Sequence, residues 1–181
     1  MYSIFIKNGL IADGTGAKAY PANLGITGDK ISYIGTEVFD AEYTIDAAGK
    51  WVTPGFIDVH SHGDLTVGSE FCALAKLSQG VTTELIGQCG MSLIPVSGKF
   101  KDMVIGMYKT TLPANAQKHI EEFTSLKGFA DYAEEDGIFM NAAMFIGHST
   151  LRMVVMGMDN RLATEEEMEE MYAEAQERGL A

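Results

Sequence analysis

Two histidines and one cysteine are the residues of this chain whose types and spacing are best suited to binding a metal ion. His60 and His62 follow an apolar run at residues 55–59, and Cys89 follows a second apolar run. Side chains two residues apart in an extended strand share one face, so the two imidazoles would form half of a metal site. Taken alone, however, a His-x-His pair is equally compatible with two ordinary loop histidines.

The elements that would position these residues favour the metal site. The strand-like segments 55–62, 80–86 and 140–146 each end at or just before a potential ligand, and the third is followed by His148. In parallel α/β folds, sites are built where strands end, and in barrels they lie at the carboxyl-terminal face. From residue 54 the strands alternate with helical segments, which predicts βαβ units and a parallel sheet.

Three motifs resemble those of the metal-dependent amidohydrolase superfamily, and within it the D-aminoacylase (N-acyl-D-amino-acid deacylase) family. They are Pro54–His62, then Gly80–Thr83 with Gly87–Ser92, and Asn141 with Gly147–Arg152. The resemblance extends over nearly the whole chain and implies an α/β fold. We therefore expect residues 1–53 to be part of a small β-sandwich, and residues 54–181 to be the first three β/α units of a TIM-like (β/α)8 barrel.

The resemblance also implies the chemistry. His60, His62 and Cys89 would bind zinc, as one or two divalent ions, because zinc accepts imidazole nitrogen and thiolate sulfur. Such an ion lowers the pKa of its bound water to about 7, so that hydroxide can attack an amide carbonyl. The expected reaction is hydrolysis of the linear amide of an N-acyl-D-amino acid or a related dipeptide. His148 and Arg152 are candidate substrate-binding residues.

Two positions depart from the family's usual pattern, which reads His-Ser-His-Asp-Asp and Gly-Asn-Cys-Gly. Here Gly63 replaces the first Asp and Gln88 replaces the Asn. Neither position is a metal ligand in the family, so the departures bear on substrate fit. The family's general-base Asp and further histidines would lie beyond residue 181. A (β/α)8 barrel typically needs about 250 residues, so we expect an N-terminal part of a longer enzyme that is inactive alone.

Two alternative functions remain open from the residues. One is a cyclic amidohydrolase resembling dihydroorotases and hydantoinases, which share the first-strand motif but use a carbamylated lysine from a later strand. The other is a truncated module that binds a metal or a partner without catalysis. The setting of Cys89, Cys-Gly-Met-Ser, favours the deacylase.

Composition excludes several classes of function. The chain of 181 residues has 46% hydrophobic residues and a net charge of −12, and this acidity argues against binding to nucleic acid. No run approaches the roughly 18 apolar residues of a membrane span, and a basic leader with an apolar core is absent. Two cysteines give no disulfide framework. We expect a cytoplasmic protein that acts on a small molecule and can form a homo-oligomer.

Local patterns predict several further features. Asn8-Gly9 and Gly28-Asp29 predict two tight turns, and residues 70–79 predict a helix closed by Gly80. Thr164 and Glu167 form a capping box that begins the last helix. Met168, Met171, Tyr172 and Ala175 follow at helical spacing and predict a stripe that faces the core.

Two regions allow less definite expectations. Residues 92–125 show no clear period and are compatible with a long loop that shapes a pocket or with a floppy insertion; His119 within them reads as a surface residue. Asp58 shares the strand face of His60 and His62. It could orient one of the two imidazoles or be a buried hydrogen-bonded carboxylate at the barrel floor.

Overall fold

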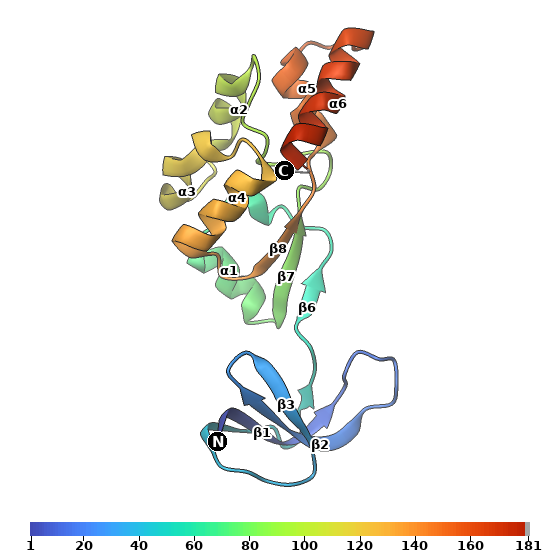
Figure 1. Cartoon of the computed structure of the whole chain (residues 1–181), viewed down its shortest axis with the longest axis vertical. Coiled ribbons are helices and arrows are strands. Elements are labelled where there is room, and N and C mark those ends of the chain that lie inside the picture. The colour runs from blue at the N-terminus through green and yellow to red at the C-terminus, as the bar shows by residue number, and fades with distance from the viewer. Residues whose placement is uncertain (180–181) are drawn as a thin grey trace. The chain divides into compact units, whose positions relative to one another are not determined.

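A computed structural model describes residues 1–179, and its contacts divide the chain after Pro54 into two compact units (Figure 1). This boundary lies one residue from the predicted one. The first unit contains one β-sheet, and the second contains a parallel sheet with helices. Each unit is described by itself.

The first unit is a five-stranded sheet in the order β3-β2-β1-β4, with β5 paired to β1. Its strands are β1 (Tyr2–Ile11), β2 (Tyr20–Thr27), β3 (Lys30–Gly35), β4 (Ala41–Asp46) and β5 (Trp51–Val52). The turn predicted at Gly28-Asp29 is confirmed, because Gly28 has a φ of +60° between the antiparallel strands β2 and β3. Several of its large apolar side chains are exposed, including Ile31, Tyr43, Ile45 and Trp51.

The turn predicted at Asn8-Gly9 is wrong. Asn8 has a φ of +62°, but it makes a bulge within the single strand β1, where the register to β2 shifts between Ile6 and Gly9. The backbone N–H of Asn8 donates to the side chain of Asn23 at 2.8 Å, and its amide donates to Asp46 at 3.0 Å. These tertiary contacts hold an Asn in the left-handed region without reversing the chain.

The second unit is built on a three-stranded parallel sheet in the order β6-β7-β8, as predicted. The strands are β6 (Phe56–Asp58), β7 (Val81–Ile86) and β8 (Asn141–Met144). The helices are α1 (Glu70–Leu77), α2 (Lys101–Tyr108), α3 (Ala114–His119), α4 (Leu126–Tyr132), α5 (His148–Met156) and α6 (Glu165–Gly179), with short helical turns η1 (Gly63–Thr66), η2 (Ile120–Glu122) and η3 (Ala133–Gly137).

The core of this unit lies between the sheet and the helices. Ile86 of β7 packs in one cluster with Val104 and Tyr108 of α2, Phe129 of α4 and Val154 of α5. Residues 92–125, expected to be a loop or a floppy insertion, instead contain α2 and α3. Their apolar residues are spaced too irregularly for a periodic signal, because each helix is only six to eight residues long.

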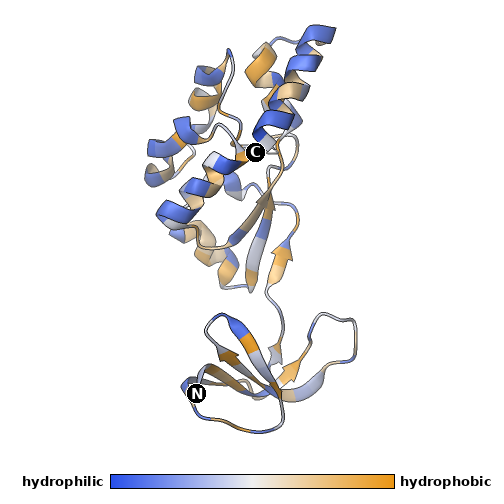
Figure 2. Cartoon of the chain, viewed as in Figure 1, coloured by the Kyte–Doolittle hydropathy of each residue, from blue (hydrophilic) through white to orange (hydrophobic). Residues whose placement is uncertain are grey.

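The last helix combines a confirmed cap with a partly wrong core prediction. The N–H of Glu167 donates to the Thr164 hydroxyl at 3.2 Å, and the N–H of Thr164 donates to Glu167 at 2.9 Å, which completes the capping box. Met171 is buried, but Met168 and Tyr172 are 53% and 65% exposed. Figure 2 shows the helix as mostly hydrophilic, so its apolar stripe is narrower than predicted. Among the described residues, no helix is long and apolar enough to cross a membrane.

Candidate metal centre

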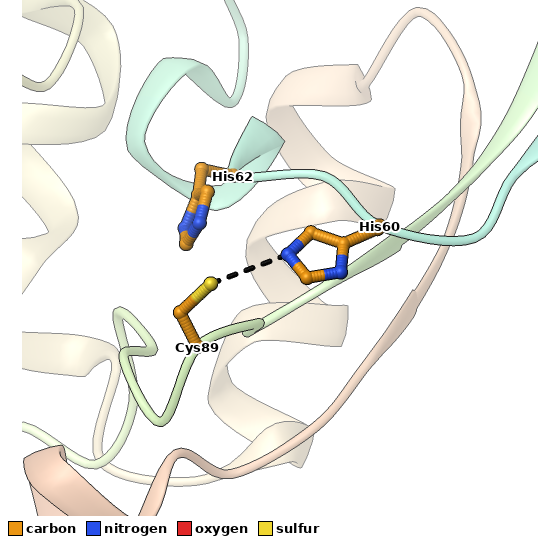
Figure 3. A group of neighbouring side chains, drawn as sticks. All are labelled: His60, His62 and Cys89. Atoms are coloured by element: carbon orange, nitrogen blue, oxygen red, sulfur yellow. Dashed lines mark hydrogen bonds between the residues drawn. The ribbon is translucent and has the colours of Figure 1, made fainter.

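His60, His62 and Cys89 come together at the carboxyl ends of two neighbouring strands. Strand β6 ends at Asp58, so both histidines lie in the loop between β6 and η1, while Cys89 lies in the loop after β7. Because β6 and β7 pair in parallel, the two loops emerge at the same end of the sheet. Figure 3 shows the two imidazoles on either side of the thiol.

The spacing of the three side chains fits a zinc ion. The Nε2 atom of His60 is hydrogen-bonded to the Sγ atom of Cys89 at 3.2 Å. One ligand atom from each residue can be chosen so that all lie within 4.8 Å of one another, and all three residues are exposed. Zinc bond lengths of about 2.3 Å to sulfur and about 2.0 Å to nitrogen place tetrahedral ligands about 3.6 Å apart. The donor set of nitrogen and sulfur atoms and its spacing therefore suit this metal.

The backbone at Cys89 is in the left-handed region, with a φ of +55°, between Gly87 at +76° and Gly90 at +75°. For a residue other than glycine this conformation raises the backbone energy, and such strain concentrates at functional sites. The conformation turns the chain sharply after β7 and directs the thiol toward the histidines. The sequence signal for it is the pair of glycines on either side of Cys89.

The first turn of α5 holds the Cys89 loop from the other side. The N–H groups of Ser149 and Thr150 donate to the Gly90 carbonyl at 2.7 and 3.3 Å. A Cβ atom at Gly147 would overlap that carbonyl, so the close approach requires glycine. His148 begins this helix beside the loop and is exposed, but it is not among the three clustered side chains.

Among the described residues Asp58 makes no hydrogen bond to an imidazole, in contrast to one of the two roles expected for it. Its Oδ1 atom accepts the backbone N–H of His60 at 3.2 Å, and its Oδ2 atom accepts from Lys76 at 2.9 Å. Its side chain is 32% exposed, so it is not a buried carboxylate either. The hydrogen bonds from Lys76 and His60 hold the pKa of the Asp58 carboxyl below its usual range. The strand ends at this residue, so the alternation of faces does not extend to the histidines.

Asp64, two residues after His62, is a buried carboxylate that the sequence did not reveal. It is 1% exposed, and its Oδ2 atom accepts the Leu93 N–H at 3.0 Å. Within residues 1–179 its Oδ1 atom has no hydrogen-bond partner. Burial raises the pKa of this carboxyl, opposed by the Leu93 N–H. Asp64 is not among the three clustered side chains, and the contact the structure shows for it is the hydrogen bond to the Leu93 backbone.

Arg152 lies in α5 beside a cavity of about 400 Å³ that also reaches Cys89. Its guanidinium donates to the carbonyls of Asp159, at 3.0 Å, and Arg161, and to the Met156 sulfur at 3.0 Å. These bonds tie the end of α5 to the loop that follows it. In this arrangement the guanidinium is occupied by the protein's own backbone, and a role in binding a substrate carboxylate stays a prediction.

Comparison with known proteins gives a consistent family. The profile described as the amidohydrolase family matches residues 43–180. The D-aminoacylase of Alcaligenes xylosoxydans xylosoxydans is 34% identical over 97% of this chain and 35% of its own length. The N-acyl-D-glutamate deacylase of the same organism is 32% identical, again over 97% of this chain and 35% of its own length.

Solved structures give the same result. The N-acyl-D-glutamate deacylase of Bordetella bronchiseptica, complexed with zinc and a phosphonate that mimics the tetrahedral intermediate, superposes with a TM-score of 0.78 at 31% identity. It matches 98% of this chain and 36% of its own chain. A D-aminoacylase with a binuclear metal centre gives a TM-score of 0.72 at 35% identity, over 97% of this chain and 36% of its own. The α/β fold is therefore that of these enzymes, and the chain spans about a third of their length.

Proposed function

We propose, because this chain belongs to the amidohydrolase family, that it is part of a zinc-dependent deacylase that hydrolyses N-acyl-D-amino acids. The observation that carries the proposal is the cluster of His60, His62 and Cys89 on two neighbouring strand ends. Relatives at 34% and 32% identity are named D-aminoacylase and N-acyl-D-glutamate deacylase, which supports the substrate class.

In this proposal His60, His62 and Cys89 hold one or two zinc ions. The ion supplies an activated water and polarises the amide carbonyl of the substrate. The residues of this chain would supply two nitrogens and one sulfur as ligands, and all three side chains are exposed and so accessible to a substrate. The chain spans about a third of the length of its relatives, and the general base and the remaining ligands are proposed to come from outside that third.

The acyl group of the substrate lies in the cavity beside Cys89. The cavity measures about 400 Å³, within the usual range for small-molecule sites, and four methionines line it. They are Met91, Met107, Met153 and Met158. Methionine side chains adapt to irregular apolar ligands, so this cavity suits an aliphatic acyl chain.

Charge supports the same choice of ligand. Asp159 and Arg152 are the charged residues among those that line the cavity. The guanidinium of Arg152 is bonded to backbone carbonyls, and Asp159 would repel an acidic group. His148, at the start of α5, is proposed to help orient the substrate. A cytoplasmic location and a homo-oligomer stay predictions.

The proposal is tested on the full-length protein by metal analysis and by hydrolysis of paired substrates. We expect retained zinc, release of D-methionine from N-acetyl-D-methionine, and much slower hydrolysis of the L-isomer. Cys89→Ala and His62→Ala are expected to lose metal and activity together. Ring opening of a hydantoin in preference to the linear amide would instead favour the cyclic amidohydrolase, and a protein that retains no metal would contradict both.

A further inference from the structure

Beside the two histidines lies a group of polar side chains that are not among the candidate metal ligands. Lys76 of α1 donates to Asp58 at 2.9 Å and to the Ser61 hydroxyl at 2.7 Å, and it is paired with Glu84 of β7. We call these four residues the Lys76 cluster. The side chain of Glu84 is 8% exposed and that of Lys76 is 30% exposed, so both charges are substantially removed from water.

The cluster is bonded to the segment that carries the two histidines. Ser61, between His60 and His62, donates its hydroxyl to Glu84, and the same oxygen accepts from Lys76 and from the N–H of Gly63, the latter at 3.0 Å. The backbone N–H of Ser61 donates to Leu85 of β7 at 3.1 Å. Asp58 accepts the N–H of His60. Hydrogen bonds from the cluster therefore fix the backbone on both sides of each histidine.

The Lys76–Glu84 ion pair is better explained by the geometry it fixes than by the stability it adds. Burying two charges carries a desolvation penalty that apolar side chains of similar volume do not have. A buried ion pair is therefore weak evidence that a protein is stabilised by it. Such pairs do fix directions, because each hydrogen bond constrains an angle as well as a distance. Here the fixed element is the turn that presents His60 and His62.

We propose that Lys76 and Glu84 are positioning residues that hold the His60–His62 turn in its ligand geometry and thereby set the affinity of this half of the site for a metal ion. The inference rests on the metal centre of the proposed function. Neither residue is among those that could bind the ion, so each acts through Ser61 and the backbone. Residues in this relation to metal ligands typically change affinity 10–100-fold when replaced.

Both departures from the family's usual pattern adjoin this arrangement. A Cβ atom at Gly63 would lie 2.5 Å from the Glu84 Oε2 atom, so a side chain there would push the carboxylate away from Lys76 and Ser61. The side-chain amide of Gln88 donates to the carbonyls of Val59 and Leu85, both at 3.2 Å, and so ties the residue after β6 to β7. Gly63 and Gln88 are thus matched to Glu84 and to the strand that leads into the histidines.

The test is a Co²⁺ titration of the metal-free full-length protein, followed by the d–d bands and the thiolate charge-transfer band. His60→Ala identifies the binding step that belongs to this half of the site. Glu84→Gln and Gly63→Ala are the test variants, and Asp131→Asn is the matched control, because it removes a carboxylate from an exposed lysine pair. Thermal denaturation of each metal-free variant measures the fold independently of the metal.

We expect Glu84→Gln and Gly63→Ala to weaken that binding step 10–100-fold and to alter its d–d bands, while Asp131→Asn leaves both unchanged. If Gly63→Ala acts by displacing Glu84, adding it to Glu84→Ala causes no further loss. Lys76→Arg, which retains the charge, should recover part of the affinity lost in Lys76→Met. Affinities within twofold of wild type, in variants that melt normally, would overturn the positioning role alone. A wild-type protein without a step sensitive to His60→Ala would instead remove the proposed metal centre.

Discussion

Replacing Thr150 by valine is expected to destabilise the protein by about 2–6 kcal/mol, because it leaves two buried backbone groups without partners. Thr150 and Ser92 are both fully buried. The Thr150 hydroxyl accepts the N–H of Ser92 at 3.0 Å and donates to the carbonyl of Ser92 at 3.0 Å. Valine has the same shape but lacks the hydroxyl, and each orphaned group costs about 1–3 kcal/mol.

The pair matters for the site because Ser92 closes the loop that carries Cys89, and Thr150 lies in the first turn of α5. The assay is urea denaturation of the full-length protein, with the free energy of unfolding compared among variants. Thr150→Ser restores the hydroxyl and should recover most of the loss. Thr111→Val is the control, because Thr111 is exposed and its hydroxyl makes one hydrogen bond, to the Tyr108 carbonyl at 2.7 Å. If Thr150→Val costs no more than this control, the two groups of Ser92 are satisfied in another way and the reasoning fails.

Three further predictions follow from the site and from the last helix. The pKa of Glu167 is lowered to about 2, mainly by its hydrogen bond to Arg161 and next by the Thr164 N–H. Its value in the unfolded chain is near 4.5, so between these two pH values the unfolded state binds more protons than the folded state. The free energy of unfolding therefore falls as the pH falls through this window. Glu167→Gln should therefore flatten the acid side of a plot of melting temperature against pH, and an unchanged slope would contradict the pairing. For the wild type, kcat/KM should rise up to about fourfold for each CH₂ added to the acyl chain, because burying one CH₂ contributes about 0.8 kcal/mol. In a series of substrates with increasing chain length, Met107→Asp should abolish this dependence. A dependence that survives in Met107→Asp would show that the acyl group does not bind in this cavity. Cys89→Gly relieves the positive φ, so the metal-free protein should gain up to about 1 kcal/mol while losing at least tenfold in zinc affinity, measured by melting with and without zinc; equal zinc stabilisation of both proteins would refute the ligand role.

The clustering of His60, His62 and Cys89 could be predicted because it depends only on chain direction. In a parallel sheet the carboxyl ends of adjacent strands meet at one edge, whatever the strand lengths. The role of Asp58 could not be predicted in the same way. It required the residue at which β6 ends, and the strand stops two residues before the first histidine.

The Lys76 cluster could not be predicted from the sequence for a related reason. Lys76 and Glu84 are eight residues apart on a helix and on the following strand, and their contact depends on how α1 rotates against β7. Asn8 shows the same limit, because its left-handed backbone suits a turn or a bulge and only the contacts with Asn23 and Asp46 distinguish them. By contrast, the capping box of Thr164 and Glu167 was predictable because every atom involved lies within one helical turn.

The left-handed backbone of Cys89 has an evolutionary consequence. A φ of +55° restricts which amino acids can replace the thiol without rebuilding the loop. Outside glycine, Asn, Asp and His are several-fold enriched in this region, and of these three only Asp and His also supply strong metal ligands. Glutamate, although chemically similar to aspartate, would carry the full energetic cost of a positive φ. In the proposed metal centre, a lineage that exchanges the thiol for another ligand would therefore have an accessible route through aspartate or histidine, and the main chain limits drift at this position independently of any metal.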